Sequence, residues 1–359
     1  SLCNGSSRPD RGAWRLQHSV AGSMNDPLSS GRMADRLETH PDAKVDVVVP
    51  VYRAAAALDR CLASVFLHTP LPPHRLILVI DGPQPEGVEE VLSRRTEGHS
   101  DDVHLIRMDF RTGFVAAANR GMSASSRDVV LLNSDTEVTA GWVEKLREAA
   151  YSAPRIATVT PLSNNATICS LPEFLEDNVL PAGISTDTMG EIVERTTRRE
   201  RPRLPTGVGV CLYIRREALD EVGLFDEKSF GLGYGEENEF CCRATAAGFE
   251  HVADDATFIF HEGQKSFGGD SSRRRRRAMR KLRSMDRTYI PRIADFIDRD
   301  PMAPIRKRVV TEIGRRRLVA RERTDAQPLS ILHVVHGWPP FATGGTEVYA
   351  RGLALLQAR

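Results

Sequence analysis

Residues 133–137 place an amide, two hydroxyls and two carboxylates immediately after the apolar stretch 129–132. A carboxylate such as Asp135, beside Asn and Thr oxygens, suits a hard divalent cation that bridges phosphates. The same residues would also suit a turn in which Asp and Asn cap a helix that starts near Ala140. This segment alone leaves the metal site and the helix cap equally open.

A second candidate lies where three glycines precede three carboxylates, in the order Gly231, Gly233, Gly235, Glu236, Glu237 and Glu239. Acidic residues at a helix start are stabilised by the helix macrodipole, and that effect alone could explain one or two of them. A glycine-rich loop that leads to clustered acids better suits a site that closes over a substrate. A partly desolvated carboxylate there has a raised pKa and can act as a general base. The run therefore favours a catalytic role over simple capping.

His261 is the third candidate, at the end of the apolar run 258–260 and before a polar, glycine-containing loop. A neutral imidazole in this place could ligate a metal. A single histidine is more often an ordinary hydrogen-bonded side chain, so its position alone favours that simpler interpretation.

These residues need elements to position them, and the pattern of the chain predicts strands alternating with helices. Continuous apolar runs predict buried strands at 45–51, 76–80, 104–108 and 129–132. Helical spacing predicts helices at 58–66, 88–92, 113–124 and 142–150. This alternation predicts an α/β fold with a mostly parallel central sheet flanked by helices.

The second half of the chain is less regular. It predicts strands at 158–161 and 207–214, helices at 215–222 and 237–247, and a long loop over 163–205. Ligands of open α/β sheets bind beyond the carboxyl ends of the strands. Polar groups follow three predicted strands there, at 50–52, 81–82 and 133–136. Together they indicate a crevice for a nucleotide or a phosphorylated ligand.

Composition excludes several classes of protein. The 359 residues are 41% hydrophobic and 27% charged, with a net charge of +1, which is typical of a globular protein rather than a disordered or fibrous one. No apolar stretch approaches the ~20 residues that span a bilayer. The six cysteines form no CxxC pair, so reduced thiols and a cytoplasmic location are expected.

Taken together, these segments resemble a family 2 glycosyltransferase of the GT-A fold, a Rossmann-like arrangement. The resemblance covers about residues 44–268, and its specificity comes from the order and spacing of the motifs. They are the segments 47–52, 80–82, 113–121, 131–136, 160–165 and 222–227, the Gly-Glu-Glu run and the segment around His261.

The resemblance implies a role for each matching position. The nucleotide-sugar site would be formed by Pro50, Tyr52, Asp81, Arg111, Asn119, Asn133 and Ser134. Within it, Asp81 would accept hydrogen bonds from the base or ribose. Asp135 would be the metal-binding acid of a DxD-type motif whose first acid is here Asn133, and His261 would complete the metal site or contact the diphosphate. Glu237 aligns with the catalytic base, although Glu236 stays an alternative.

The implied reaction is an inverting displacement. The base takes a proton from an acceptor hydroxyl, and Mg²⁺ or Mn²⁺ neutralises charge on the leaving nucleoside diphosphate. The expected partners are a nucleotide-sugar donor and a glycan or lipid-linked acceptor, in polysaccharide, lipopolysaccharide or glycoprotein assembly. Nucleic acid is not expected, because no recognition motif or aromatic interleaving is present.

Four regions are expected along the chain. They are a flexible leader (1–43), the GT-A domain (44–268), a basic helical extension (269–328) and a truncated first βα unit of a GT-B, family 4 domain (329–359). The basic run 273–283 fits peripheral contact with the inner face of a membrane, or a solvated helical face packed on the catalytic domain. The tail and the absence of an initial Met suggest a piece of a longer bifunctional protein.

Two other functions stay open. A non-catalytic nucleotide-sugar-binding module would bind a nucleoside diphosphate without turnover, but the acids at 236–239 argue against it. A nucleotidyltransferase usually needs a Gly-rich and basic loop after its first strand, where this chain has 52–56 (Tyr-Arg-Ala-Ala-Ala). This third function is therefore the weakest of the three.

Overall fold

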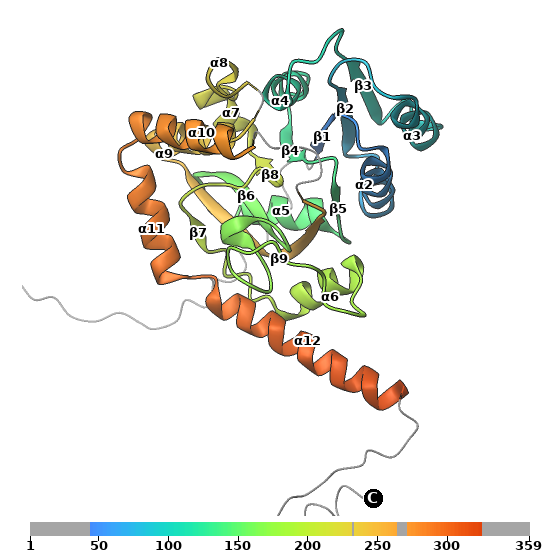
Figure 1. Ribbon diagram of the computed structural model, residues 1–359, viewed down its shortest axis with the longest axis vertical. Helices are drawn as coiled ribbons and strands as arrows, with labels where there is room; N and C mark the ends of the chain where they lie inside the picture. Colours follow the sequence, from blue (N-terminus) through green and yellow to red (C-terminus); the bar gives the residue numbers. More distant parts are fainter. Residues whose placement is uncertain (1–43, 232, 264–270, 325–359) are drawn as a thin grey trace, which may run out of the picture. The chain divides into compact units, whose positions relative to one another are not determined.

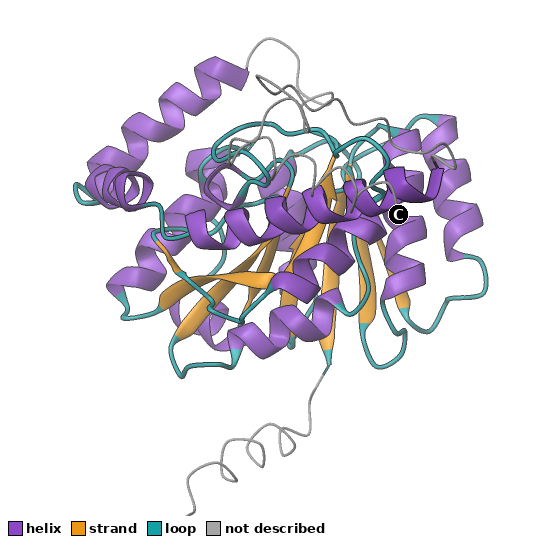
Figure 2. Cartoon of the chain, turned by 90° about the horizontal axis from the view of Figure 1, so that it is seen from below, coloured by secondary structure: helices purple, strands orange, loops and turns teal. Residues whose placement is uncertain are grey.

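The computed structural model describes residues 44–231, 233–263 and 271–324 (Figure 1). The expected leader (1–43) and the expected GT-B unit (329–359) lie outside these residues. The described helices and strands form an α/β fold with helices on both sides of a central sheet (Figure 2). The predicted fold class is therefore confirmed.

The first half of the sheet is parallel, as predicted. Strands β1 (Val45–Val51), β2 (Arg75–Ile80), β3 (Val103–Arg107) and β4 (Asp128–Leu132) lie in the order β3-β2-β1-β4. Every residue of β1 is buried. Such a strand needs helices on both faces, which is why its sequence is continuously apolar rather than alternating.

The helices divide between the two faces according to the alternation of β1. Val47, Val49 and Val51 pack in one apolar cluster with α2 (Ala55–His68) and α3 (Glu86–Thr96). Val48 packs in the other cluster with α4 (Phe114–Ser123) and α9 (Glu236–Ala246). Because successive side chains of a strand point to opposite faces, one strand anchors both cores.

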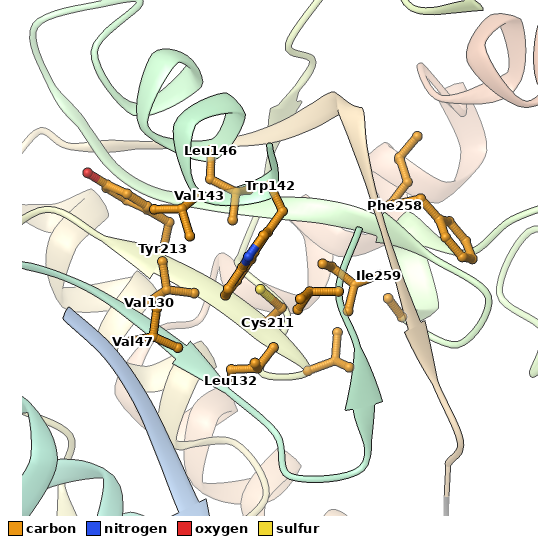
Figure 3. Close-up of a cluster of buried hydrophobic side chains, with 14 of the residues drawn as sticks. Val47, Val130, Leu132, Trp142, Val143, Leu146, Cys211, Tyr213, Phe258 and Ile259 are labelled. Carbon is orange, nitrogen blue, oxygen red and sulfur yellow. The ribbon is translucent and has the colours of Figure 1, made fainter. Parts of the chain in front are cut away.

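The second half of the sheet is mixed. Strand β8 (Cys211–Ile214) runs antiparallel between β4 and β6 (Ile156–Ser163), and β6 is parallel to β9 (Glu250–His261). The short strand β5 (Thr136–Glu137) pairs antiparallel with the end of β9. Figure 3 shows Trp142, at the start of α5 (Trp142–Ala150), among side chains from β4, β8 and β9.

The predicted loop over 163–205 is wrong in part. It contains a 3₁₀ turn, η1 (Thr167–Cys169), the helix α6 (Thr186–Thr196) and the two-residue strand β7 (Arg203–Leu204). Ser185 caps α6 by accepting a hydrogen bond from the Thr188 N–H. The helix is mostly polar and buries only a narrow apolar stripe against β9, so its periodicity in the sequence is weak.

Helices continue after the sheet. Two short ones, α7 (Arg216–Val222) and α8 (Glu227–Phe230), precede α9. The helical extension consists of α10 (Ser271–Met285), α11 (Tyr289–Arg299) and α12 (Ala303–Thr324). None of the helices in the described ranges is long and apolar enough to cross a membrane.

Candidate active site

A cavity of about 290 Å³ opens at the carboxyl ends of the parallel strands. Ten of the eleven residues predicted for the site line it: Pro50, Tyr52, Asp81, Arg111, Asn133, Ser134, Asp135, Glu236, Glu237 and His261. They come from segments far apart in the sequence. The topology therefore brings the predicted nucleotide, metal and acid residues to one place.

Asp135 and His261 meet because β5 and β9 pair. Thr136 lies opposite His261 in this ladder, and the Glu262 N–H donates to the Asp135 carbonyl at 3.0 Å. Oδ1 of Asp135 is 3.4 Å from Nε2 of His261. The helix-cap alternative for this segment is wrong, because α5 begins after Gly141 and has no side-chain cap.

The orientation of the His261 ring fits a metal ligand. Its Nδ1 lies 2.9 Å from the Asn165 carbonyl oxygen, which can only accept, so Nδ1 carries the proton. Nε2 is then the atom that could bind a metal, and its partner oxygen fixes the ring as outer-shell partners of metal ligands do. Burial lowers the pKa of His261, but the hydrogen bond and negative charge of Asp135 outweigh burial and raise it.

The pair on its own is an incomplete coordination sphere. Within the described ranges, no group of three or more His, Cys, Asp or Glu side chains is arranged to hold a metal ion. Divalent cations bound at phosphate sites often take only one or two carboxylates from the protein and complete their sphere with phosphate and water. Asp135 and His261 fit that kind of site.

Asp81 is hydrogen-bonded to the loop that follows β3. Its Oδ1 accepts hydrogen bonds from the Thr112 N–H and hydroxyl at 2.6 and 3.0 Å, and its Oδ2 accepts from the Gly113 N–H at 3.0 Å. The carboxylate therefore fastens the loop that carries Arg111. The Arg111 guanidinium lies 4.2 Å from the ring centroid of Tyr52, a cation–π distance. Asp81 thus supports this stacked wall of the cavity.

Gly82 makes the close approach of this loop possible. A Cβ at position 82 would lie 2.5 Å from the Arg111 nitrogen, and the backbone has a φ of +76°. Both features exclude larger residues without a shift of the loop. The Asp-Gly pair after β2 is therefore a structural clasp for the Tyr52–Arg111 wall of the cavity.

Glu236 and Glu237 lie at the start of α9 and both line the cavity. Glu236 is only 5% exposed, and its Oε2 has no hydrogen-bond partner among the described residues. Burial and then the charge of Glu237 raise the pKa of Glu236 well above its usual value. Burial also raises the pKa of Glu237. A carboxyl pair of this kind shares its protons and titrates as a unit.

Glu239 belongs to a different part of the structure. Its two oxygens accept hydrogen bonds from Nε and a terminal nitrogen of Arg243 at 2.7 and 2.8 Å. Arg243 also donates to the Leu224 carbonyl at 2.7 Å. The third acid of the run is thus a buried ion-pair partner, and only the first two face the cavity.

Asn119 does not line the cavity. Its amide donates to the Phe225 carbonyl at 3.0 Å and accepts from the Phe225 N–H at 3.1 Å. Both ends of the amide are therefore engaged in holding the segment before α8 against α4. Asn119 therefore supports the fold next to the cavity, and the contact with nucleotide or sugar that the resemblance implied stays a prediction.

Twelve further residues line the cavity without a predicted role. They are mostly small or apolar: Val51, Gly113, Phe114, Ala117, Asn165, Ala166, Thr167, Val208, Gly209, Val210, Gly233 and Tyr234. Five of them, Val51, Gly113, Phe114, Ala117 and Asn165, belong to the segments 47–52, 113–121 and 160–165 that carry the resemblance, which is the signal that could have identified them. The others are mostly small or apolar, and residue type alone does not predict which such residues line a cavity.

Known proteins show similarity in both sequence and fold. Residues 46–223 match the model of the family described as "Glycosyl transferase family 2". An N-acetylglucosaminyl-diphospho-decaprenol L-rhamnosyltransferase of Mycobacterium tuberculosis is 27% identical over 246 residues, covering 62% of this chain and 78% of the relative. Glycosyltransferase AglE of Haloferax volcanii is 25% identical over 206 residues, covering 57% of this chain and 62% of the relative.

A solved structure, that of GalNAc-T7 with UDP, GalNAc and Mn²⁺, superposes with a TM-score of 0.53 at 17% identity. The match covers 74% of this chain and 53% of that chain, so the chain spans about half its length. At this identity the likeness concerns the fold. Fold and matches together define a glycosyltransferase of the GT-A class. More specifically, the chain carries a family 2 glycosyltransferase domain.

Proposed function

We propose that the chain transfers a sugar from a nucleotide-diphosphate sugar to a hydroxyl of a glycan or lipid-linked acceptor, with inversion at the anomeric carbon. The observation that carries the proposal is the cavity itself. It is lined by a pair of side chains suited to bind a divalent cation, Asp135 and His261. It is also lined by two carboxyl groups whose pKa is raised, Glu236 and Glu237. The acceptor class is supported by the rhamnosyltransferase relative, whose name specifies a diphospho-decaprenol compound.

The residues divide the work of the reaction. The Tyr52–Arg111 wall would hold the nucleotide, and Asp81 would keep that wall in place. Glu237 would take the proton of the attacking hydroxyl, and its burial would raise its basicity. Asp135 and His261 would hold a Mg²⁺ or Mn²⁺ ion, which would stabilise the negative charge of the leaving diphosphate.

The test measures release of nucleoside diphosphate from a panel of nucleotide sugars with Mn²⁺, with Mg²⁺ and with EDTA. We expect release with at least one donor, its loss in EDTA, and loss of more than about 100-fold in Glu237→Gln. Proton NMR of the product tests the inversion. Full activity of Asp135→Ala, or of a Glu236→Ala, Glu237→Ala double variant, would contradict the proposal. Calorimetric binding of nucleoside diphosphate with no turnover would support the non-catalytic alternative.

We also propose that α10 contacts an anionic membrane surface at the inner face of the membrane. Ala278 and Leu282 of this helix are buried. Four of its arginines are exposed: Arg276, Arg277, Arg280 and Arg283. Arginines attract anionic lipid headgroups at about 1 kcal/mol each near the surface.

Replacing these four arginines with Gln should abolish sedimentation of the protein with phosphatidylglycerol vesicles. Removing equal charge at exposed Arg94, Arg107, Arg203 and Arg317 should not, and equal losses in both variants would overturn the proposal.

A further inference from the structure

The helical extension packs directly on the segment that carries the acid pair. Gly235 immediately precedes Glu236, and a Cβ at Gly235 would lie 3.0 Å from the Ala278 Cβ of α10. Nearby, Lys281 Nζ of α10 is 5.5 Å from the ring centroid of Phe230. The extension follows the part of the chain that matches the family, residues 46–223. It nevertheless forms one wall behind the start of α9.

One polar contact links the extension to the residue next to the acid pair. Tyr289, the first residue of α11, is 3% exposed, and its hydroxyl donates to Oδ1 of Asn238 at 3.0 Å. Nδ2 of Asn238 in turn donates to the Thr206 hydroxyl at 3.3 Å. The tyrosine therefore fixes the orientation of the amide, with Oδ1 toward α11 and Nδ2 toward Thr206. With Oδ1 occupied, the donor end of Asn238 is the one available to Glu237.

We infer that Tyr289 is a positioning residue for the candidate base: it holds Asn238 so that this amide donates to Glu237. The inference rests on the proposed function in taking Glu237 as the base. It gives α11 a role in positioning the acid pair, in addition to any role of the extension at a membrane. A hydrogen bond from Asn238 stabilises the charged form of Glu237 and lowers its pKa, against the larger effect of burial.

The direction of the effect follows from these contacts. The titratable groups within the described ranges that interact with Glu237 are Glu236 and Cys241 on α9 and Tyr289 on α11. No cation is among the causes that set the pKa of Glu237. Neutral donors such as Asn238 therefore limit the rise of this pKa. Releasing Asn238 should raise it further and move the acidic limb of activity to higher pH.

Tyr289→Phe tests this by removing one hydroxyl. We expect the kcat of nucleoside diphosphate release to fall about fivefold to tenfold, as for one lost hydrogen bond, with KM for the nucleotide sugar nearly unchanged. The acidic limb of the pH profile should shift upward. The matched control is Tyr151→Phe, which removes a hydroxyl that donates to Asp128 at 2.7 Å. Asp128 keeps the Tyr213 hydroxyl at 2.5 Å, so this control should change neither kcat nor the pH profile.

Asn238→Ala supplies the second variant. It should reproduce the pH shift, and adding Tyr289→Phe to it should shift the limb no further, because both changes remove the same interaction. Equal pH profiles for Tyr289→Phe and Tyr151→Phe would overturn the inference. So would additive shifts in the double variant.

A substrate-free measurement separates this inference from the proposed function. Isotope-edited infrared spectroscopy follows the protonated Glu carboxyl band with pH, and Glu237→Gln identifies the component of Glu237. In Tyr289→Phe that component should persist to higher pH than in the unmodified chain or in Tyr151→Phe. If no donor is turned over, the proposed function fails, and the infrared titration still decides whether Tyr289 positions Glu237. An unchanged titration would overturn the inference.

Discussion

Oδ1 of Asp135 lies 3.4 Å from Nε2 of His261, and the backbone pairing of β5 with β9 sets that distance. The two residues are remote in sequence, and the ladder that joins them has only two residue pairs. Such a short ladder has little stability of its own. The side chains around it therefore carry much of the positioning of the candidate metal ligands.

Replacing either member of this pair should weaken metal binding. Asp135→Asn removes the only carboxylate of the pair, and His261→Ala removes the ring nitrogen that faces it. We expect each variant to weaken Mn²⁺ binding in the presence of nucleoside diphosphate by at least about tenfold. Electron paramagnetic resonance of free Mn²⁺ measures this. Asp177→Asn is the control, because Asp177 acts on His261 only through its charge. An equal loss in the control would contradict a ligand role.

Arg60 should matter to the same site from outside the cavity. It forms ion pairs with Glu137 of β5 and with Glu262, the residue after β9, so it clasps the ladder from α2. Its side chain is 46% exposed, so Arg60→Ala should change the free energy of unfolding by less than about 1 kcal/mol. We expect Mn²⁺ affinity to fall severalfold nonetheless. Arg94→Ala, which removes the ion pair between Arg94 of α3 and Asp59 of α2, should leave Mn²⁺ affinity unchanged.

The buried acid pair should cost stability at neutral pH. Burial raises the pKa of folded Glu236 above that of the unfolded chain. The folded state therefore holds a proton that the unfolded state has lost, and stability falls as the pH rises from the ordinary Glu pKa through the raised one. Glu236→Gln should remove this loss and increase the free energy of unfolding by about 1 kcal/mol at neutral pH.

Urea denaturation across this pH range measures the effect. Glu239→Gln is the control on the same helix, and it should destabilise, because it leaves Arg243 without its carboxylate partner. If both variants were destabilised equally, with the same dependence on pH, the raised pKa of Glu236 would be refuted.

Two glycines allow the clasp after β2 to be tested directly. Gly82 and Gly98 have nearly the same backbone φ, +76° and +79°, but a Cβ at Gly98 would meet nothing within 4 Å. Gly98→Ala should therefore cost only the left-handed strain, about 1–2 kcal/mol. Gly82→Ala adds the clash with the Arg111 backbone and should cost more. It should also weaken binding of nucleoside diphosphate, measured by calorimetry. Equal stability and equal affinity for the two variants would exclude the clasp.

Much of the sheet was predictable because its strands are buried on both faces. Runs such as 45–51 and 129–132 are continuously apolar, and the helices between them bury clear stripes. The helix α6 was missed because its segment is polar apart from one narrow stripe. The strand β5 was missed because two residues are too few to show the alternation of apolar and polar side chains that indicates a strand. Its existence depends on its partner β9 rather than on local sequence.

The site shows the same contrast between features that local sequence predicts and features that depend on distant partners. Residues at strand ends and at the start of α9 could be placed from their local pattern, since topology brings strand ends together. The roles of Asp81 and Asn119 could not, because each depends on which backbone groups lie opposite, at 112–113 and at Phe225. Tyr289 gave no signal at all. Its partner Asn238 belongs to another helix, and one tyrosine in an amphipathic helix looks like any core residue.

The antiparallel strand β8 marks a seam between two halves of the sheet. Residues before the seam supply Tyr52, Asp81 and Arg111, whereas the acid pair and His261 all follow it. A chimaera with a crossover inside β8 would therefore take the Tyr52–Arg111 wall and Asp135 from one parent, and the acid pair and His261 from the other. The Asp135–His261 pair would then be assembled from both parents, so such a hybrid would keep its cavity only if both parents align β5 with β9 in the same way.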